Sequence, residues 1–266
     1  LSAWLRDAKI DLGTIGLTSY LLTMYSLKVL WAPVVDKVPV PLLSRLFGRR
    51  RAWMLLAQII IIGGLCGMSL QDPSQALGGL IGFALLTAFG GATQDIAIDA
   101  WRIEAAPNGR QDAMAASYQM GYRVGLLAAG AGALAVADQQ DWHFAYLCMA
   151  ALMLLGVLTT LCVPEPEARV SADTRERERR VEEFLAARQH WPASLRSAGA
   201  RVVEAVVLPF VDFFARNGMA FGWLILAFVG CFRLTDITMG VMSNPYYLDM
   251  GYTKLDIALI AKGYGI

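Results

Sequence analysis

Residues 94–102 read Gln-Asp-Ile-Ala-Ile-Asp-Ala-Trp-Arg and end an apolar run that begins near Ala76. The run is long enough to cross a bilayer as a helix, which takes about 20 residues. On that helix Asp95 and Asp99 share one face, and Arg102 follows Asp99 by three residues. A carboxylate at membrane depth is costly, so it normally faces protein, a cavity or water and indicates function. For Asp99, which lies nearer the helix end, the alternative is a structural ion pair with Arg102.

The composition is that of a membrane protein. Of the 266 residues, 56% are hydrophobic, and the mean hydropathy is +0.48, which is too apolar for an ordinary soluble domain. A formal net charge of +1 gives no reason to expect nucleic-acid binding. The four cysteines stand singly in apolar runs and the two histidines lie far apart, so we expect no disulfide, no metal site and no bound cofactor.

The alternation of apolar runs and polar loops predicts an all-α polytopic membrane protein. Pro39 and Pro41 break the chain after the first complete run, and Pro164 and Pro166 break it again later. We expect membrane helices at about residues 12–34, 52–70, 76–101, 111–137, 142–163 and 219–242, after the last turn of an earlier helix at residues 1–5. In the helix at 111–137, Gly121, Gly125 and Ala129 form a small-residue face that predicts close approach of another helix.

Arginine is concentrated in alternate loops. The loops after the helices at 52–70 and 111–137 contain no Lys or Arg, and Arg6 and Lys9 are the exceptions on that side. By the positive-inside rule, the arginine-rich loops are cytoplasmic. Those loops hold Arg45, Arg49, Arg50, Arg51, Arg102, Arg110 and the run at 175–180.

The order of segments predicts three parts. Residues 1–164 form an N-terminal transmembrane half from the end of helix one to helix six, and residues 216–266 start a C-terminal half with helix seven and part of helix eight. Residues 165–215 form a cytoplasmic linker between them. Within the linker we expect a solvated helix at Thr174–Gln189 and an amphipathic interfacial helix at Leu195–Ala215.

The start of the chain is echoed near its end. Trp4–Leu12 and Tyr247–Leu255 each combine an aromatic-Leu helix end, a short polar loop and a new apolar helix. Six helices, a long linker and a restart in the same orientation predict two parallel six-helix repeats. We read the chain as part of a longer protein, with most of helix one and the helices after the eighth outside it.

Two blocks of sequence resemble a known transporter family. Residues 30–36 (Leu-Trp-Ala-Pro-Val-Val-Asp) followed by 48–53 (Gly-Arg-Arg-Arg-Ala-Trp) resemble the loop 2–3 motif of major facilitators. The resemblance implies a gating role for Asp36, Gly48, Arg49, Arg50 and Arg51, and Arg49–Arg51 can reach acids such as Glu104. The loop between the blocks is longer than the short form usual in the family.

Three further blocks resemble the AmpG-type muropeptide permeases, in the branch of major facilitators that carries peptides, acetyl-CoA and drugs. They are 28–33 (Lys-Val-Leu-Trp-Ala-Pro), 92–102, and Arg233-Leu-Thr-Asp236 with Asn244-Pro-Tyr-Tyr. The resemblance implies a monomer in the bacterial inner membrane. It would import anhydro-muropeptides, GlcNAc–anhydroMurNAc with or without a stem peptide, for peptidoglycan recycling linked to β-lactamase induction. The import would be driven by the proton gradient.

Five ionisable residues lie within the expected spans: Lys28, Asp95, Arg123, Arg233 and Asp236. Lys28 and Asp95 each lie six residues from the same side of the membrane, roughly 9 Å inside it, so opposite charges at equal depth predict an ion pair. The alternative for Lys28 is snorkelling to the interface. Arg233 and Asp236 are three residues apart, so the alternative for them is a pair with each other.

Arg123 is expected near the midplane, with Tyr118, Gln119 and Tyr122 beside it. Such a set can bind a carboxylate and stack on a sugar ring. The alternative is a polar contact between helices. Together, the candidates for substrate binding or proton coupling are Lys28, Gln94, Asp95, Asp99, Tyr118, Gln119, Tyr122, Arg123, Arg233 and Asp236.

Other functions fit the sequence less well. Asp95-xxx-Asp99 also resembles half of the Mg²⁺-diphosphate site of intramembrane prenyltransferases, but only Asp236 is offered in place of a second acidic cluster. A membrane scaffold without a substrate is a further alternative, as is a major facilitator for another substrate such as acetyl-CoA or a drug. We therefore expect a transporter and not an enzyme.

Overall fold

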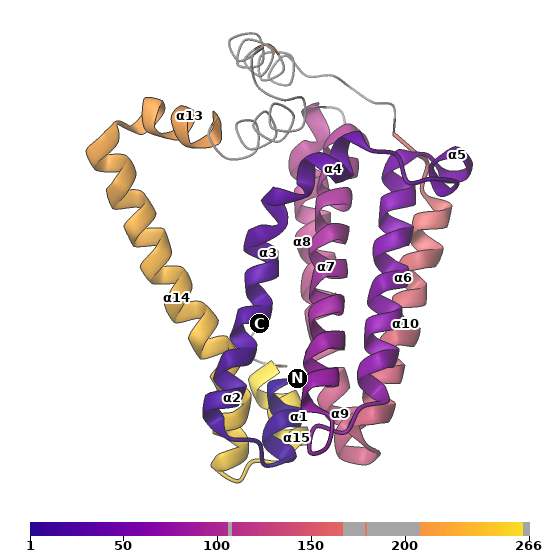
Figure 1. The fold of residues 1–266 in the computed structure, drawn as a ribbon, viewed down its shortest axis with the longest axis vertical. Helices are drawn as coiled ribbons and strands as arrows, with labels where there is room; N and C mark the ends of the chain where they lie inside the picture. The colour runs from indigo at the N-terminus through magenta and orange to yellow at the C-terminus, as the bar shows by residue number, and fades with distance from the viewer. Residues whose placement is uncertain (106–107, 167–178, 180–207, 263–266) are drawn as a thin grey trace.

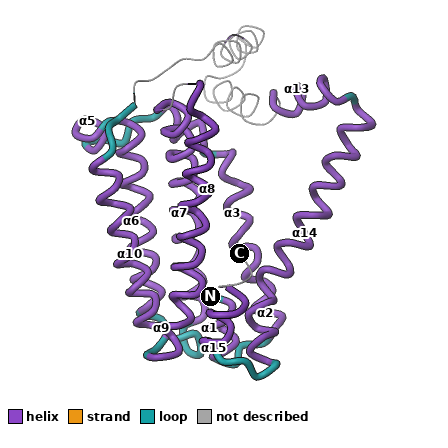
Figure 2. Tube along the Cα trace, turned by 180° about the vertical axis from the view of Figure 1, so that it is seen from behind, coloured by secondary structure: helices purple, strands orange, loops and turns teal. Residues whose placement is uncertain are grey.

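The computed structural model describes residues 1–105, 108–166, 179 and 208–262. Throughout this part the regular elements are helices, arranged side by side in one layered bundle with a single long helix leaning against it (Figure 1; Figure 2). Within the described ranges, four helical runs are long and apolar enough to cross a membrane: Arg49–Ser69, Leu77–Ala105, Gln111–Gln139 and Trp142–Cys162.

The centre of the bundle is formed by α6 (Arg49–Ser69), α7 (Leu77–Ala105) and α10 (Trp142–Cys162), with α6 packed against both of the others. Small residues permit this packing. A Cβ atom at Gly67 of α6 would overlap the Phe83 ring of α7. A buried hydrogen bond of 2.8 Å from Gln58 Nε2 to Thr160 Oγ1 links α6 to α10.

The helix expected at residues 12–34 is not continuous. It is a series of short segments: α2 (Leu12–Leu17), η1 (Thr18–Leu22), α3 (Thr23–Leu27), η2 (Lys28–Leu30) and α4 (Ala32–Lys37). The Thr18 and Ser19 hydroxyls each donate a 2.7 Å hydrogen bond to a carbonyl three residues back, and Pro33 begins α4. Such bonds and a proline both favour 3₁₀ turns and bends over a regular α-helix.

The expected helix at 111–137 is also interrupted. It consists of α8 (Gln111–Leu127), a π-helical turn η4 (Ala128–Gly132) and α9 (Ala133–Gln139). The predicted close approach at Gly121 and Gly125 was wrong for the described residues, because none of their atoms lies within 4 Å of a Cβ built at either glycine. The described packing of this run is made by η4, which contains Ala129, and by α9.

Helix ends differ from expectation by a few residues. The helix α6 begins at Arg49, so the three arginines belong to its first turn, and α7 extends to Ala105. The helix α14 (Met219–Asp249) continues through Pro245, where we expected it to end. A proline inside a helix removes one backbone hydrogen bond, and Pro245 is fully buried, so packing around it offsets this loss.

The two ends of the molecule are packed differently. We call the end that carries Arg49–Arg51 the basic end. There, the core of Val35, Met54, Ile96 and Ala97 comes from α4, α6 and α7 only. At the opposite end, the core joins α1 (Ser2–Asp7) and α10 to η6 (Ile257–Lys262), with α14 packed against it.

The long helix α14 therefore joins the bundle at one end only. It meets α1 and α2 at the opposite end and diverges from α3 toward the basic end (Figure 1). The helix α13 (Leu208–Asn217) precedes it and turns into it at Gly218. The expected helix at 174–189, and the part of the one at 195–215 before Leu208, lie outside the described residues.

Candidate functional site

The predicted ion pair between Lys28 and Asp95 is present. The Lys28 Nζ lies 3.6 Å from Asp95 Oδ2, and each side chain keeps about a third of its surface exposed (33% and 36%). The position of Lys28 is held by Trp31. The Trp31 indole N–H donates a 3.1 Å hydrogen bond to Thr93 Oγ1, and its ring packs on Phe89. These contacts hold η2 against α7 and keep the ammonium beside the carboxylate.

A second charged group lies further toward the basic end. Arg102 Nη2 is 3.4 Å from Asp99 Oδ1, which is the structural ion pair weighed above for Asp99. The Arg102 guanidinium also lies over the ring of Tyr118, 4.9 Å from its centroid, so it links α7 to α8. On the same helix, the Gln94 carboxamide oxygen is buried without a hydrogen-bond partner among the described residues.

The other candidate binding residues on α8 have exposed side chains. Gln119, Tyr122 and Arg123 are exposed, and within the described part of the chain the Arg123 side chain has neither an ion pair nor a hydrogen bond. An unpaired guanidinium in a membrane span requires water or a ligand, so Arg123 is free to bind one. The side chains of Arg233 and Asp236, on α14, lie outside the described residues.

At the basic end, Arg50 is the centre of a charge network. Its Nη1 lies 2.7 Å from Asp36 Oδ1 and its Nη2 lies 2.6 Å from Glu104 Oε1, and the side chain is only 7% exposed. Arg49 lies 3.9 Å from the same Glu104 oxygen. The predicted reach of the arginines to Glu104 is therefore confirmed. The network ties the end of α4 and the start of α6 to the end of α7.

Neighbouring contacts join α6 to α10 at this end. Glu165 accepts hydrogen bonds from the backbone N–H groups of Arg50 (2.7 Å) and Arg51 (3.1 Å), which satisfies the start of α6. In return, the Arg51 side chain donates to the carbonyls of Thr160 and Leu161 at the end of α10. Gly48 is required here because its φ is +88° and a Cβ would overlap the Glu165 side chain.

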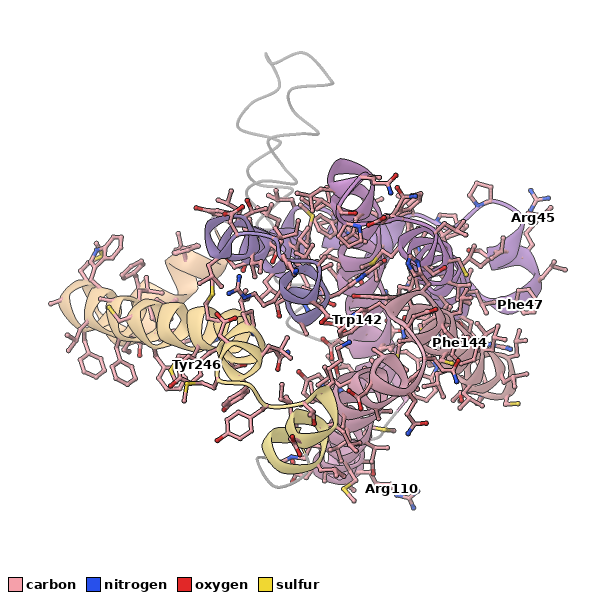
Figure 3. The ribbon with its side chains drawn as sticks, turned by 90° about the horizontal axis from the view of Figure 1, so that it is seen from below. Arg45, Phe47, Arg110, Trp142, Phe144 and Tyr246 are labelled. Carbon is pink, nitrogen blue, oxygen red and sulfur yellow. The ribbon has the colours of Figure 1, made fainter. Side chains whose placement is uncertain are left out.

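At the opposite end, two ion pairs join the beginning of the chain to its last helices. Arg6 Nε lies 2.6 Å from Asp249 Oδ1, and Lys254 Nζ lies 2.7 Å from Asp7 Oδ2. Trp142 donates a 2.8 Å hydrogen bond to Asp7, and its ring lies 5.2 Å from Lys254 Nζ. We call these two pairs the latch; Figure 3 views the molecule from this end.

Asp7 is charged in the latch over a wide pH range. Burial opposes its ionisation, but the hydrogen bonds from Lys254 and Trp142 and the charge of Lys254 outweigh that effect. The pKa of Asp7 therefore lies below its ordinary value.

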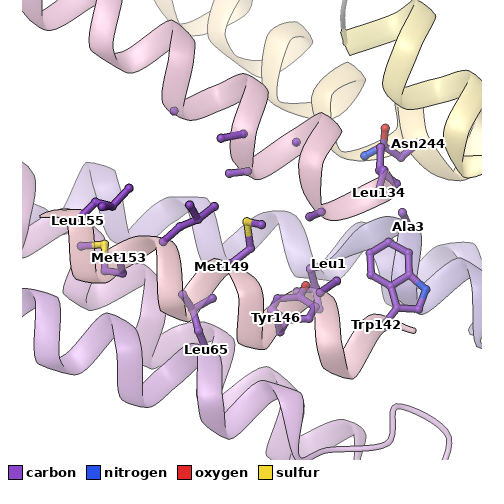
Figure 4. A pocket seen from close by; sticks show the side chains of 17 residues that line it. Leu1, Ala3, Leu65, Leu134, Trp142, Tyr146, Met149, Met153, Leu155 and Asn244 are labelled. Carbon is purple, nitrogen blue, oxygen red and sulfur yellow. The ribbon is translucent and has the colours of Figure 1, made fainter. Parts of the chain in front are cut away.

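A cavity of about 640 Å³ lies next to the latch, with Trp142 in its lining, and apart from the Lys28–Asp95 pair. It is bordered by η4, α9, α10 and α1, with Asn244 of α14 at one side (Figure 4). Its lining is mainly Ala, Leu and Met, and none of the predicted binding residues belongs to it. Such a lining offers few partners for hydroxyl or carboxylate groups, so we place the polar site at Lys28 and Asp95 instead.

Comparison with known proteins identifies the family. A family model described as Major Facilitator Superfamily matches residues 1–266. The chain belongs to the Major Facilitator Superfamily. This is a family of transporters and not of enzymes.

Relatives within the superfamily cover the whole of this chain. It is 33% identical over 268 residues to the Putative transporter AmpG 4 of Rickettsia felis, covering 100% of this chain and 59% of that protein. It is 32% identical to the Anhydromuropeptide permease of Escherichia coli K12, covering 100% of this chain and 48% of that protein. The chain thus spans about half the length of the curated relatives that it matches.

Sequence reasoning missed two parts of this major facilitator's charge pattern. Glu165 was taken only as a break between two prolines, although an acid directly after a helix can reach a basic helix start on the same side of the membrane. The latch was missed as well. Its first pair joins positions 243 apart, which is the spacing of the two echoed segments, so the echo itself could have pointed to Arg6 and Asp249.

Proposed function

We propose that the protein to which this chain belongs imports anhydro-muropeptides across the bacterial inner membrane, driven by the proton gradient. The substrate class is GlcNAc–anhydroMurNAc with or without a stem peptide. Two findings support this class. The chain belongs to a family of membrane transporters, and one relative that matches it over its whole length is named an anhydromuropeptide permease.

The observation that carries the proposal is the accessible ion pair of Lys28 with Asp95. Charged groups within a membrane are costly and typical of substrate or proton pathways. An ion pair that only stabilised the fold could be fully buried. In this pair, about a third of the surface of each side chain is exposed. The free guanidinium of Arg123 supplies a second cation for a carboxylate of the substrate.

The pair couples proton uptake to substrate binding. While Lys28 lies beside it, the Asp95 carboxylate is stabilised in its charged form. A carboxylate of the substrate attracts Lys28 and draws it away. Asp95 then loses its cation in a membrane environment and takes up a proton, so the acid is neutral when the substrate is bound.

The basic end faces the cytoplasm in this proposal, because its loops carry the arginines. The charge network of Arg50 then lies at the cytoplasmic side and the latch at the periplasmic side. With the halves packed together at the latch and α14 diverging at the basic end, the conformation corresponds to one open to the cytoplasm.

Uptake measurements test the proposal directly. Cells lacking their own muropeptide permease receive the full-length gene, and entry of radiolabelled GlcNAc–anhydroMurNAc is followed with and without a protonophore. We expect accumulation that the protonophore abolishes. Absence of uptake at normal protein levels would refute the substrate class, and accumulation that is unaffected by the protonophore would refute proton coupling.

A further inference from the structure

Tyr25 lies beside the Lys28–Asp95 pair and has no role in the account so far. It is in α3, three residues before Lys28, so the two side chains leave the helical run on the same side. Its ring is 40% exposed. On α7 its hydroxyl lies at Gly91, one turn before Asp95, where an added Cβ would come within 2.5 Å of the phenol oxygen. The absence of a side chain at Gly91 therefore leaves the space that the Tyr25 hydroxyl fills.

Two more tyrosines complete an aromatic group around the pair. Tyr118 and Tyr122 are four residues apart on α8, so their side chains share one face of that helix. Tyr118 is held from the other side by the guanidinium of Arg102, and Tyr122 is 56% exposed. The tyrosines thus come from two separate helical runs, α3 and α8, and the contacts of Tyr25 with Gly91 and of Tyr118 with Arg102 place them beside α7.

In the part of the chain that the structure describes, the hydroxyl groups of Tyr25, Tyr118 and Tyr122 neither donate nor accept a hydrogen bond. Tyr residues in a membrane-spanning region normally find a partner for the hydroxyl. Free phenol hydroxyls beside exposed aromatic faces and an ammonium are the groups that bind a sugar, whose ring presents C–H bonds to an aromatic face and hydroxyls at its edge.

We propose that Tyr25 is a substrate-contacting residue that, with Tyr118 and Tyr122, holds a sugar ring against the Lys28–Asp95 pair. Gly91 sets the position of its hydroxyl. This inference rests on the proposed function and adds to it a residue that selects for the saccharide part of the substrate. Contact with the sugar beside the pair brings the substrate's acidic group to Lys28.

The test uses four variants of the full-length protein. Tyr25→Phe removes the hydroxyl, Tyr25→Leu removes the ring, and Gly91→Ala displaces the hydroxyl without altering Tyr25. Tyr20→Phe is the matched control, because it removes a phenol hydroxyl from the same helical run at a position that is 71% exposed. Equilibrium binding of labelled GlcNAc–anhydroMurNAc is measured for each, together with the KM, maximal rate and pH profile of uptake.

A lost hydrogen bond of ordinary strength weakens binding about fivefold, and a lost stacking contact adds about tenfold. We therefore expect Tyr25→Phe and Gly91→Ala to weaken disaccharide binding about fivefold and to raise KM, with an unchanged pH profile. Tyr25→Leu should weaken it more than tenfold, and Tyr20→Phe should behave as the wild type. A merely structural role would lower the maximal rate and the protein level instead.

Two failures are distinguishable. If the wild type binds the disaccharide and both Tyr25→Phe and Gly91→Ala bind it equally well, the inference about Tyr25 is wrong and the proposed function stands. If the folded wild type does not bind the disaccharide at all, both are wrong. Should Tyr25→Leu fail to fold, the other two variants still decide.

Discussion

Asp95 is the residue whose charge the proposed mechanism uses most directly. Asp95→Asn resembles the protonated acid, so it should abolish proton-driven accumulation while downhill exchange of labelled substrate continues. Both are measured in proteoliposomes of the full-length protein, with and without an imposed pH gradient. Accumulation by the variant at the wild-type level would show that Asp95 does not carry the proton.

The charge-swapped variant Lys28→Asp/Asp95→Lys is the control for this experiment. It keeps one cation and one anion at a distance of a few ångströms, whereas Lys28→Ala leaves a carboxylate without its cation. We expect the double variant to recover the folded protein level that Lys28→Ala lowers. Recovery of fold without recovery of transport would separate the stability of the pair from its function.

Arg123 is predicted to bind an anionic group of the substrate. A guanidinium binds a carboxylate through two parallel hydrogen bonds, which an ammonium cannot reproduce. Arg123→Lys should therefore weaken binding of a stem-peptide substrate about tenfold although the charge is kept. Titration with the labelled ligand measures this, and normal binding and transport by Arg123→Ala would show that the contact does not exist.

At the scale of elements, the charge network at the basic end links the end of α4 and the start of α6 to α7. Asp36→Asn removes one of the two acids that face the buried Arg50 guanidinium and leaves Glu104 in place. We expect uptake to slow about tenfold, since a hydrogen bond to a charged group contributes about 1.5–3 kcal/mol. Equilibrium binding of substrate should stay within a few-fold of the wild type. Weaker binding at an unchanged exchange rate would contradict a gating role.

Sequence reasoning located the elements well where apolar length or the distribution of charge restricts their position. Apolar length predicted α6, α7 and α10 to within a few residues, and loop arginines pointed to the network at Arg50. The predicted pairing of Lys28 with Asp95 is present even though η2 is a 3₁₀ turn. Over the three residues of η2, a rise of about 2.0 Å instead of about 1.5 Å per residue adds about 1.5 Å, which a flexible lysine absorbs.

Contacts between distant elements could not be predicted in the same way. The small residues Gly121 and Gly125 predicted close approach of another helix, but no described atom packs against either glycine. The π-helical turn at Ala128–Gly132 gave no signal, because alanine favours a regular α-helix and glycine permits many backbone geometries. Tyr25 and Gly91 are 66 positions apart by number, and only the packing of α3 on α7 brings them together.

For the whole molecule, we predict that the latch keeps the end opposite Arg49–Arg51 closed. Arg6→Asp places two carboxylates in contact and should shift the protein toward opening at that end. Spin labels on cysteines at the exposed positions Gln139 and Tyr252, in a cysteine-free background, report the distance across it. We expect longer distances in Arg6→Asp and their return to wild-type values in Arg6→Asp/Asp249→Arg. Identical distance distributions in wild type and Arg6→Asp would show that the latch is unimportant for closure.

The latch should also respond to acid in a defined direction. Because the pKa of Asp7 is lowered, its contribution is fully present above the ordinary pKa of about 3.9. It is lost only as the pH falls through the lower value in the folded protein. The same labels should therefore report a closed latch from neutral pH down to about pH 4. Asp7→Asn should remove the acid-induced change, and opening between pH 7 and pH 5 would contradict the assignment to Asp7.

The spacing of 243 residues between Arg6 and Asp249 bears on how such a transporter could have arisen by gene duplication. In a symmetric dimer, a residue near the twofold axis faces its own copy. Two identical halves would thus have set arginine against arginine or aspartate against aspartate at this point. In this chain the two equivalent positions instead carry opposite charges, Arg6 and Asp249, so the contact attracts.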